Sequence, residues 1–244
     1  MTCIVGIVDD GRVVIGSDSL ASMDDWGRER LDKKIFSNGE YVIGVCGSYR
    51  AAQILKYEVN FPKLVLEQQF ENPNKRSNNR KSGASGHSNQ PSNMPLESSE
   101  MPPEGQINSN TAESTKDNLE AIHRFFVKKI VPLIIGAFEK HGYDPDKGDD
   151  NSFGAIVGID KYVIEIEPDY GIGVYDNYAA CGSGMHYALS SFYTIEKLQE
   201  AGRVLDINAD QKALLSLMAS SEHVGSVGGT LYAMDTKDKS IYIL

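Results

Sequence analysis

Short runs of β-branched and other apolar residues, separated by turn residues, recur along the chain in a pattern typical of antiparallel hairpins. Asp9-Asp10-Gly11 is the turn signal between the first two runs. Residues 19–33 are polar and follow no period, so irregular structure is expected there. The runs predict strands at residues 2–8, 12–17, 34–36, 41–46, 153–159, 162–166, 169–176, 178–181, 227–234 and 240–244.

Longer stretches with apolar residues at helical spacing lie between these hairpins. They predict helices over residues 49–57, 117–141 and 208–223, and a further helix that follows Gly184 and ends near residue 200. This order is not a βαβαβ alternation, which argues against a doubly wound parallel sheet. It favours an α+β fold, a four-layer αββα sandwich in which two antiparallel sheets stack face to face with the helices outside.

Residues 71–116 differ in kind from the rest of the chain. The stretch is rich in Asn, Ser, Pro, Gly and Glu and almost empty of aromatic and β-branched residues. Such a segment cannot bury enough apolar area to offset the entropy that it loses on ordering. We therefore expect a single domain over residues 1–244 that carries a disordered insertion at 71–116.

Charge and composition narrow the classes of partner and compartment. The net charge of −10 argues against nucleic acid or an anionic membrane as the main partner. No apolar run is long enough to span a bilayer, and the start of the chain lacks the basic and apolar regions of a signal peptide. Cys3, Cys46 and Cys181 are far apart and odd in number, which suggests a reducing compartment and a cytoplasmic protein. The five histidines show no metal-ligand spacing, so neither a metal nor another cofactor is expected.

Candidate chemistry gathers at the start of the chain. In a hairpin centred on Asp10, paired residues have numbers that sum to about 20, which places Asp18 opposite Thr2. Once Met1 is removed, Thr2 would carry a free α-amine with an ordinary pKa of about 8. A threonine with its own amine is an established nucleophile–base pair. Lys34, at the head of a later strand, would lower the pKa of amine and hydroxyl by its charge, and Asp18 would hold that lysine charged.

The spacing of these residues resembles that of a known family. The segment TCIVGIVDDGRVVIGSDSLAS, residues 2–22, resembles the start of mature proteasome β-type subunits and of the HslV peptidase, which are N-terminal-nucleophile (Ntn) hydrolases. Those chains carry an acidic residue sixteen positions after the first threonine, and Thr2 and Asp18 match that spacing. Asp32-Lys33-Lys34-Ile35-Phe36 is similar to the family's Lys-Ile/Leu-Phe motif, so Lys34 takes the place of the catalytic lysine.

Further positions follow from the same resemblance. Gly47 stands where the family supplies an oxyanion-binding N–H, and Val45 is expected to line the substrate pocket. Ser183, in Gly182-Ser183-Gly184, takes the role of the serine near the α-amine. The family often has an aspartate and a serine before a late Gly-Gly; here Glu222 and Ser226 are only neighbours of those positions.

The resemblance implies a threonine-type peptidase that cleaves polypeptides. Met1 would be removed by an aminopeptidase, the subunits would form a closed homo-oligomeric ring, and an ATPase unfoldase would be a possible partner. Two alternatives stay open. One is a small-molecule amidohydrolase of the same fold and chemistry, and the other is a non-catalytic, ring-forming subunit.

Overall fold

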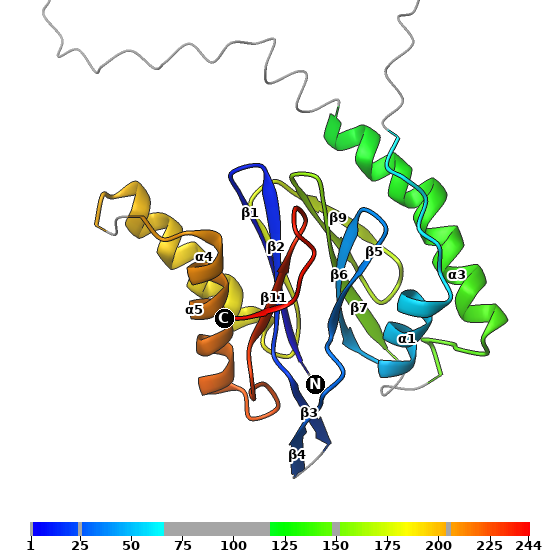
Figure 1. The fold of residues 1–244 in the computed structure, drawn as a ribbon, viewed down its shortest axis with the longest axis horizontal. Helices are drawn as coiled ribbons and strands as arrows, with labels where there is room; N and C mark the ends of the chain where they lie inside the picture. The colour runs from blue at the N-terminus through cyan, green and yellow to red at the C-terminus, as the bar shows by residue number, and fades with distance from the viewer. Residues whose placement is uncertain (1, 24–25, 66–117, 148–151, 204–205) are drawn as a thin grey trace, which may run out of the picture.

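The computed structural model describes residues 2–23, 26–65, 118–147, 152–203 and 206–244. The predicted insertion at 71–116 lies outside these residues. Two five-stranded antiparallel sheets stack face to face, and a separate two-stranded hairpin extends beside the N-terminus (Figure 1). Helices cover the outer face of each sheet, so the predicted four-layer αββα sandwich is confirmed.

The first sheet has the order β10-β1-β2-β11-β12 and the second has the order β5-β6-β7-β8-β9. The strands of the first sheet are β1 (Cys3–Asp9), β2 (Arg12–Ser17), β10 (Tyr178–Gly182), β11 (Tyr232–Asp235) and β12 (Tyr242–Ile243). Those of the second are β5 (Ile35–Asn38), β6 (Tyr41–Gly47), β7 (Phe153–Ile159), β8 (Tyr162–Ile166) and β9 (Ile172–Tyr175). The termini of the described chain both belong to the first sheet.

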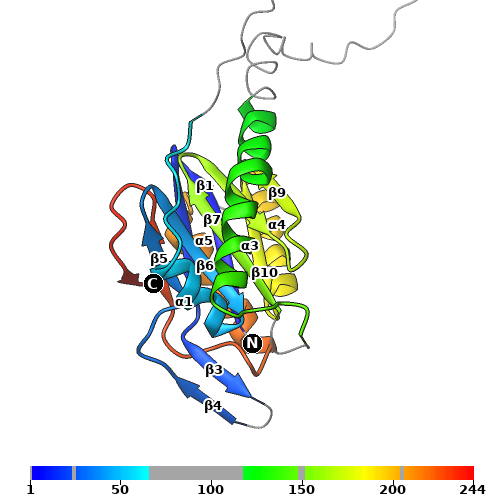
Figure 2. The same ribbon diagram turned by 90° about the vertical axis from the view of Figure 1, so that its right-hand side faces the viewer.

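Two helices lie on each outer face, as Figure 2 shows for the side of the second sheet. The first sheet is covered by α4 (Met185–Glu200) and α5 (Ala209–His223), and the second by α1 (Tyr49–Tyr57) and α3 (Val131–Lys140). The helix predicted over 117–141 is seen from residue 118, with a π-helical turn η2 (Phe126–Ile130) before α3.

Alternation along the strands divides the apolar side chains into three layers. On β1, Ile4 packs between the two sheets, whereas Val5 and Ile7 pack under α4 and α5. A third cluster joins the second sheet to α1 and α3. Successive side chains of a strand point to opposite faces, so one apolar strand can serve two layers. Each large apolar side chain buried in this way stabilises the fold by about 1.5–3 kcal/mol.

The register of the first hairpin differs by one residue from the prediction. Ile4 pairs with Ser17 and Asp9 with Arg12, so paired numbers sum to 21 rather than 20. The reason is a two-residue turn at Asp10 and Gly11, both of which have positive φ, 45° and 66°. The prediction had centred the hairpin on Asp10 itself.

Two other segments depart from the predicted elements. The stretch 19–33, expected to be irregular, contains the hairpin of β3 (Leu20–Met23) and β4 (Trp26–Glu29). The strand predicted over 227–234 is limited to β11, because residues 227–231 form a loop that turns toward the end of β2. Gly228 in that loop accepts hydrogen bonds from the N–H groups of Ser19 and Leu20, which fixes the loop beside the β3–β4 hairpin.

Candidate active site

Asp18, the residue after β2, is the centre of a buried polar cluster. Its side chain is fully buried and accepts three hydrogen bonds. Oδ1 accepts from Lys34 Nζ at 2.8 Å and from the Cys3 backbone N–H at 3.0 Å, and Oδ2 accepts from the Gly228 N–H at 3.1 Å. The corrected register explains this geometry, since Asp18 lies across from Cys3, next to Thr2 and not opposite it. The carboxylate therefore connects the predicted lysine to the backbone directly after Thr2.

Lys34 enters this cluster from the residue before β5. Its Nζ also donates to the Leu20 carbonyl oxygen at 2.7 Å, and its side chain is only 3% exposed. Burial disfavours the charged ammonium and lowers the pKa of Lys34, although the charge and hydrogen bond of Asp18 act in the opposite direction. The lysine is thus held in one orientation while its charge is less stable than in water.

Thr2 directly precedes β1, an interior strand of the first sheet, and is 5% exposed. Its carbonyl oxygen accepts hydrogen bonds from Ser183 Oγ at 3.3 Å and from the Gly184 N–H at 3.4 Å. Gly182, with φ +91°, passes so close that a Cβ there would lie 2.2 Å from this oxygen. The Gly-Ser-Gly segment after β10 therefore holds the Thr2 backbone, and a side chain at 182 is excluded by contact and by backbone conformation.

A pocket opens beside Thr2 between β5, β6 and α1. It encloses about 130 Å³. Val45 and Phe36 supply buried apolar side chains to the wall, and Gly47 at the end of β6 also faces the pocket. Gly47 has φ +82°, and a Cβ there would lie 2.2 Å from the Ser152 carbonyl oxygen. The full lining consists of Thr2, Asp32, Lys33, Lys34, Phe36, Val45, Gly47, Ser48, Tyr49, Ala52, Gln53, Lys56 and Tyr57.

The loop that leads to β11 adds residues that the sequence had left unresolved. Ser226 Oγ lies 3.2 Å from Ser183 Oγ, so the two hydroxyls form one chain that ends on the Thr2 carbonyl oxygen. Glu222, by contrast, is exposed in the last turn of α5. Of the two neighbours named from the sequence, the structure brings Ser226 to the site and leaves Glu222 at the surface.

The β3–β4 hairpin contributes a further acidic residue that the sequence analysis did not consider. Glu29 Oε1 accepts from Ser19 Oγ at 2.8 Å and from the Thr230 N–H at 3.0 Å. These hydrogen bonds lower the pKa of Glu29. The contact ties the hairpin to the loop that donates to Asp18. Its only sequence signal would have been an acidic residue in a polar segment, which is too common to single out.

Cys3 adjoins Thr2 but does not face the pocket. Its Sγ donates to Ser220 Oγ on α5 at 3.4 Å, and burial raises the pKa of the thiol to about 12. A thiol is a nucleophile only as the thiolate. Among the side chains at this end of the sheet, Cys3 is therefore a packing residue.

Within the ranges that the structure covers, no three His, Cys, Asp or Glu side chains are grouped so that they could hold a metal ion. In the same ranges, no helix has both the length and the apolar character needed to cross a bilayer.

Comparison with solved structures identifies the architecture. The chain matches no protein-family model and no curated protein. BPH from Thiobacillus denitrificans aligns over 96% of each chain at 18% identity with a TM-score of 0.59. The complex of that protein with epoxomicin aligns over 96% of this chain and 97% of its own at 16% identity, also with a TM-score of 0.59. HslV from Trypanosoma brucei aligns over 96% of this chain and 98% of its own at 12% identity, with a TM-score of 0.49. At these identities the likeness to BPH concerns the fold alone, the four-layer αββα sandwich.

Proposed function

We propose that this chain is a threonine-type peptidase, in which Thr2 becomes the nucleophile once Met1 has been removed. One observation carries the proposal: the buried Lys34–Asp18 pair is bonded to the backbone next to Thr2, and Lys34 lines the same pocket as Thr2. The hairpin spacing predicted Asp18 and the resemblance predicted Lys34, and the contact between them supports the proposal.

The arrangement supports a two-step hydrolysis. The free α-amine of Thr2 takes the proton from Thr2 Oγ as the oxygen attacks the carbonyl carbon of the scissile peptide bond. The resulting oxyanion would be held by the N–H of Gly47. The same amine then protonates the leaving nitrogen, the C–N bond breaks, and an ester remains on Thr2. Water, activated by that amine, hydrolyses the ester and restores the hydroxyl.

Lys34 and Asp18 have positioning and electrostatic roles in this proposal. The ammonium of Lys34 favours the deprotonated form of a neighbouring amine and stabilises negative charge that develops on the threonine oxygen. Asp18 fixes the lysine through a 2.8 Å contact. Ser183 and Ser226 hold the Thr2 carbonyl and hence the direction of the chain end.

Energetics favour a catalytic role over a scaffolding role. Moving two charges out of water costs several kcal/mol per ion, and a buried ion pair is often no more stabilising than apolar residues of the same volume. The pair here has side chains 3% and 0% exposed. A subunit that served only as a ring component would gain nothing from this arrangement, whereas a hydrolase would.

Polypeptides are the substrate class that we propose, with assembly into closed rings. Support for association comes from large apolar side chains on the outer helices, with Tyr193 on α4 58% exposed and Met218 on α5 51% exposed. A second copy of the chain would cover them. An ATPase unfoldase as partner and a cytoplasmic location extend the same proposal; the three free thiols are compatible with a reducing compartment.

Hydrolysis of peptide amides by three purified proteins tests the proposal. The wild type should release a fluorophore from N-acylated peptides, Thr2→Ser should retain part of this activity, and Thr2→Ala should retain none. Serine keeps a hydroxyl beside the amine, whereas alanine keeps only the amine. Activity on small amides but not on peptides would replace polypeptides with a small-molecule substrate. Equal rates for the wild type and Thr2→Ala would exclude Thr2 as the nucleophile.

A further inference from the structure

Two thiols from different sheets meet in the apolar layer between the sheets. Cys46 belongs to β6 and Cys181 to β10, and their side chains are part of one buried cluster. The neighbouring Cys181 thiol lowers the pKa of Cys46, and the Cys46 thiol together with burial raises the pKa of Cys181. Gly154 packs against both: a Cβ there would lie 3.1 Å from Cys46 Sγ and 3.9 Å from Cys181 Cβ. Nothing in the proposed hydrolysis uses either thiol.

The third cysteine is on the opposite face of the first sheet. Cys3 packs under α4 and α5, in a different apolar layer from the other two, and its Sγ contacts Ser220. Cys3 therefore lacks access to Cys46 or Cys181 without a rearrangement of β1. The chain has three cysteines, so this leaves one pair and one internal control.

The position of the pair relates it to the site. Cys46 directly precedes Gly47, whose N–H is proposed for the oxyanion, and Cys181 directly precedes Gly182, which supports the Thr2 carbonyl. A Cβ at Gly182 would also lie 3.2 Å from Cys46 Cβ, which shows how closely β10 approaches β6 here. A covalent link between the thiols would join the strand under the oxyanion site to the strand under the nucleophile.

We propose that Cys46 and Cys181 form a disulfide when the protein meets a peroxide, and that the bond suppresses hydrolysis at Thr2. In the first step the Cys46 thiolate attacks one oxygen of hydrogen peroxide, the O–O bond breaks, and a sulfenic acid and hydroxide result. Cys181 sulfur then attacks Cys46 sulfur, and the S–O bond breaks. The proton of Cys181 and the displaced hydroxyl leave as water. In sum two thiols are oxidised to one disulfide and one peroxide is reduced to two waters.

The bond would constrain the two sheets at this point. A disulfide has a fixed length of about 2.05 Å and a preferred dihedral angle. We expect β6 and β10 to adjust to this geometry and Gly47 to shift relative to Thr2. A misplacement of about 1 Å at a catalytic group costs on the order of 10²-fold in rate. The disulfide itself stands independently of the proposed function, whereas its effect on hydrolysis rests on that function.

Thiol counting by mass tests the disulfide directly. The full chain is treated with hydrogen peroxide, denatured and alkylated with N-ethylmaleimide, and its intact mass is then measured. We expect three adducts before treatment and one afterwards, with a digest that yields a Cys46–Cys181 linked peptide. Cys46→Ala and Cys181→Ala should form no such link, and Cys3→Ala should still form it. Three adducts after treatment, or a link through Cys3, would overturn the proposal.

The effect of the disulfide on hydrolysis requires a separate measurement. Peptide hydrolysis by the wild type should fall at least tenfold after peroxide and return with dithiothreitol, while Cys181→Ala keeps its untreated rate after peroxide. An unchanged rate in protein that carries the disulfide would overturn the regulatory effect. No hydrolysis in untreated, reduced protein would instead count against the proposed function and leave the mass result standing.

Discussion

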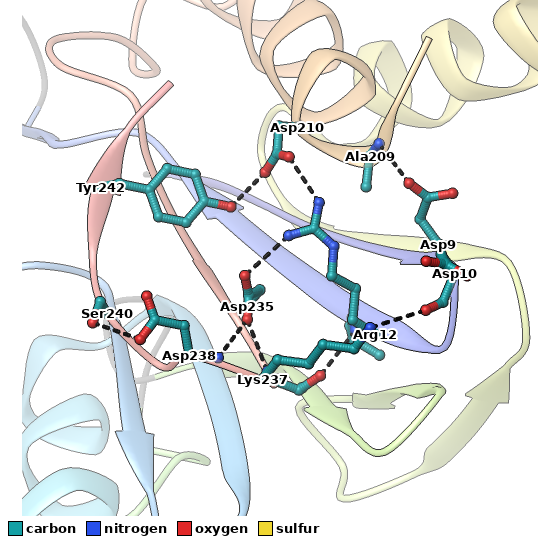
Figure 3. A network of polar contacts seen from close by, with 12 residues as sticks. Asp9, Asp10, Arg12, Ala209, Asp210, Asp235, Lys237, Asp238, Ser240 and Tyr242 are labelled. Atoms are coloured by element: carbon teal, nitrogen blue, oxygen red, sulfur yellow. Dashed lines mark hydrogen bonds and ion pairs between the residues drawn. The ribbon is translucent and has the colours of Figure 1, made fainter. Parts of the chain in front are cut away.

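Strand β2 carries a cation–carboxylate cluster at each end, and the two clusters differ in their access to water. At the site end, Lys34 pairs with Asp18, with side chains 3% and 0% exposed. At the hairpin end, Arg12 contacts Asp210 at 2.8 Å and Asp235 at 3.0 Å, and its side chain is 23% exposed (Figure 3). The first cluster lies beside a pocket, and the second joins β2 to β11 and to the start of α5.

The two clusters shift the pKa of their cations in opposite directions. For Lys34, burial outweighs the attraction of Asp18, and the pKa of the lysine is lowered. For Arg12, burial acts in the same sense, but the hydrogen bonds and charges of Asp210 and Asp235 outweigh it, and its pKa is raised. The partly exposed ion pairs of Arg12 thus stabilise its charge. The buried pair holds Lys34 where its charged form is less stable than in water.

Removal of one partner of the buried pair should have the largest effect. Asp18→Asn or Lys34→Met should each destabilise the fold by about 3–5 kcal/mol, because an uncompensated charge stays buried. The double variant should recover much of that loss, since neither position then carries a buried charge. Peptide hydrolysis should be absent in all three. Urea unfolding and a peptidase assay measure both quantities. An active double variant would reduce the pair to a structural feature.

Two glycines with positive φ offer a second comparison. Gly182 has φ +91° with the Thr2 carbonyl oxygen 2.2 Å from a built Cβ, whereas Gly11 has φ +66° and nothing within 4 Å. Gly11→Ala should cost about 1 kcal/mol from the backbone alone. Gly182→Ala should cost more and should lower hydrolysis by about 10²-fold, because Thr2 is displaced. Equal effects of the two changes on activity would show that the contact at 182 does not position Thr2.

Loss of the hairpin-end cluster should affect stability only. Arg12→Met removes two partly exposed ion pairs and should cost about 1–2 kcal/mol. Hydrolysis per folded molecule should stay within a factor of two of the wild type, because Arg12 lies at the opposite end of β2 from Asp18. Thermal unfolding and the peptidase assay, run on the same preparation, provide the check. A tenfold loss of activity would mean that the two ends of β2 are coupled.

The smallest effect should be a change in the acid limb of the stability profile. Burial alone would raise the pKa of Asp235, but the N–H groups of Asp238 and Lys237 and the charge of Arg12 lower it below the ordinary value of 3.8. The stabilisation from this carboxylate is therefore complete above pH 3.8 and is lost as the pH falls through the lowered pKa. Asp235→Asn should flatten that part of the curve of unfolding free energy against pH. An identical acid limb in both proteins would exclude a contribution of the Asp235 carboxylate to stability.

The sequence predicted the strands well where burial on both faces gives a continuous apolar run, as in β1, β6 and β7. Asp18 was predicted from the hairpin spacing and Lys34 from the resemblance to the family's lysine motif. The error in the hairpin register came from one detail of turn chemistry. Asp10 and Gly11 together form the two-residue turn, which moves every partner by one position. Asp18 reached its place beside Thr2 in spite of the error, because its side chain contacts the backbone at Cys3.

The parts that sequence reasoning missed depend on contacts between distant segments. The sequence predicts a strand over 227–234, but residues 227–231 form a loop in which the Gly228 N–H donates to Asp18. Ser226, in the same loop, reaches the site through a contact with Ser183. The β3–β4 hairpin lacks a continuous buried face, so its sequence carries no alternation.

Intact mass after treatment with epoxomicin, the ligand in the BPH complex, tests the central claim most directly. The account predicts that the purified chain lacks Met1 and gains the mass of one inhibitor per subunit. Thr2→Ala should also lose Met1 and gain nothing, and pretreatment of the wild type should abolish its hydrolysis of peptides. An active wild type that retains Met1, or an adduct of equal yield on Thr2→Ala, would contradict the assignment of Thr2 as nucleophile.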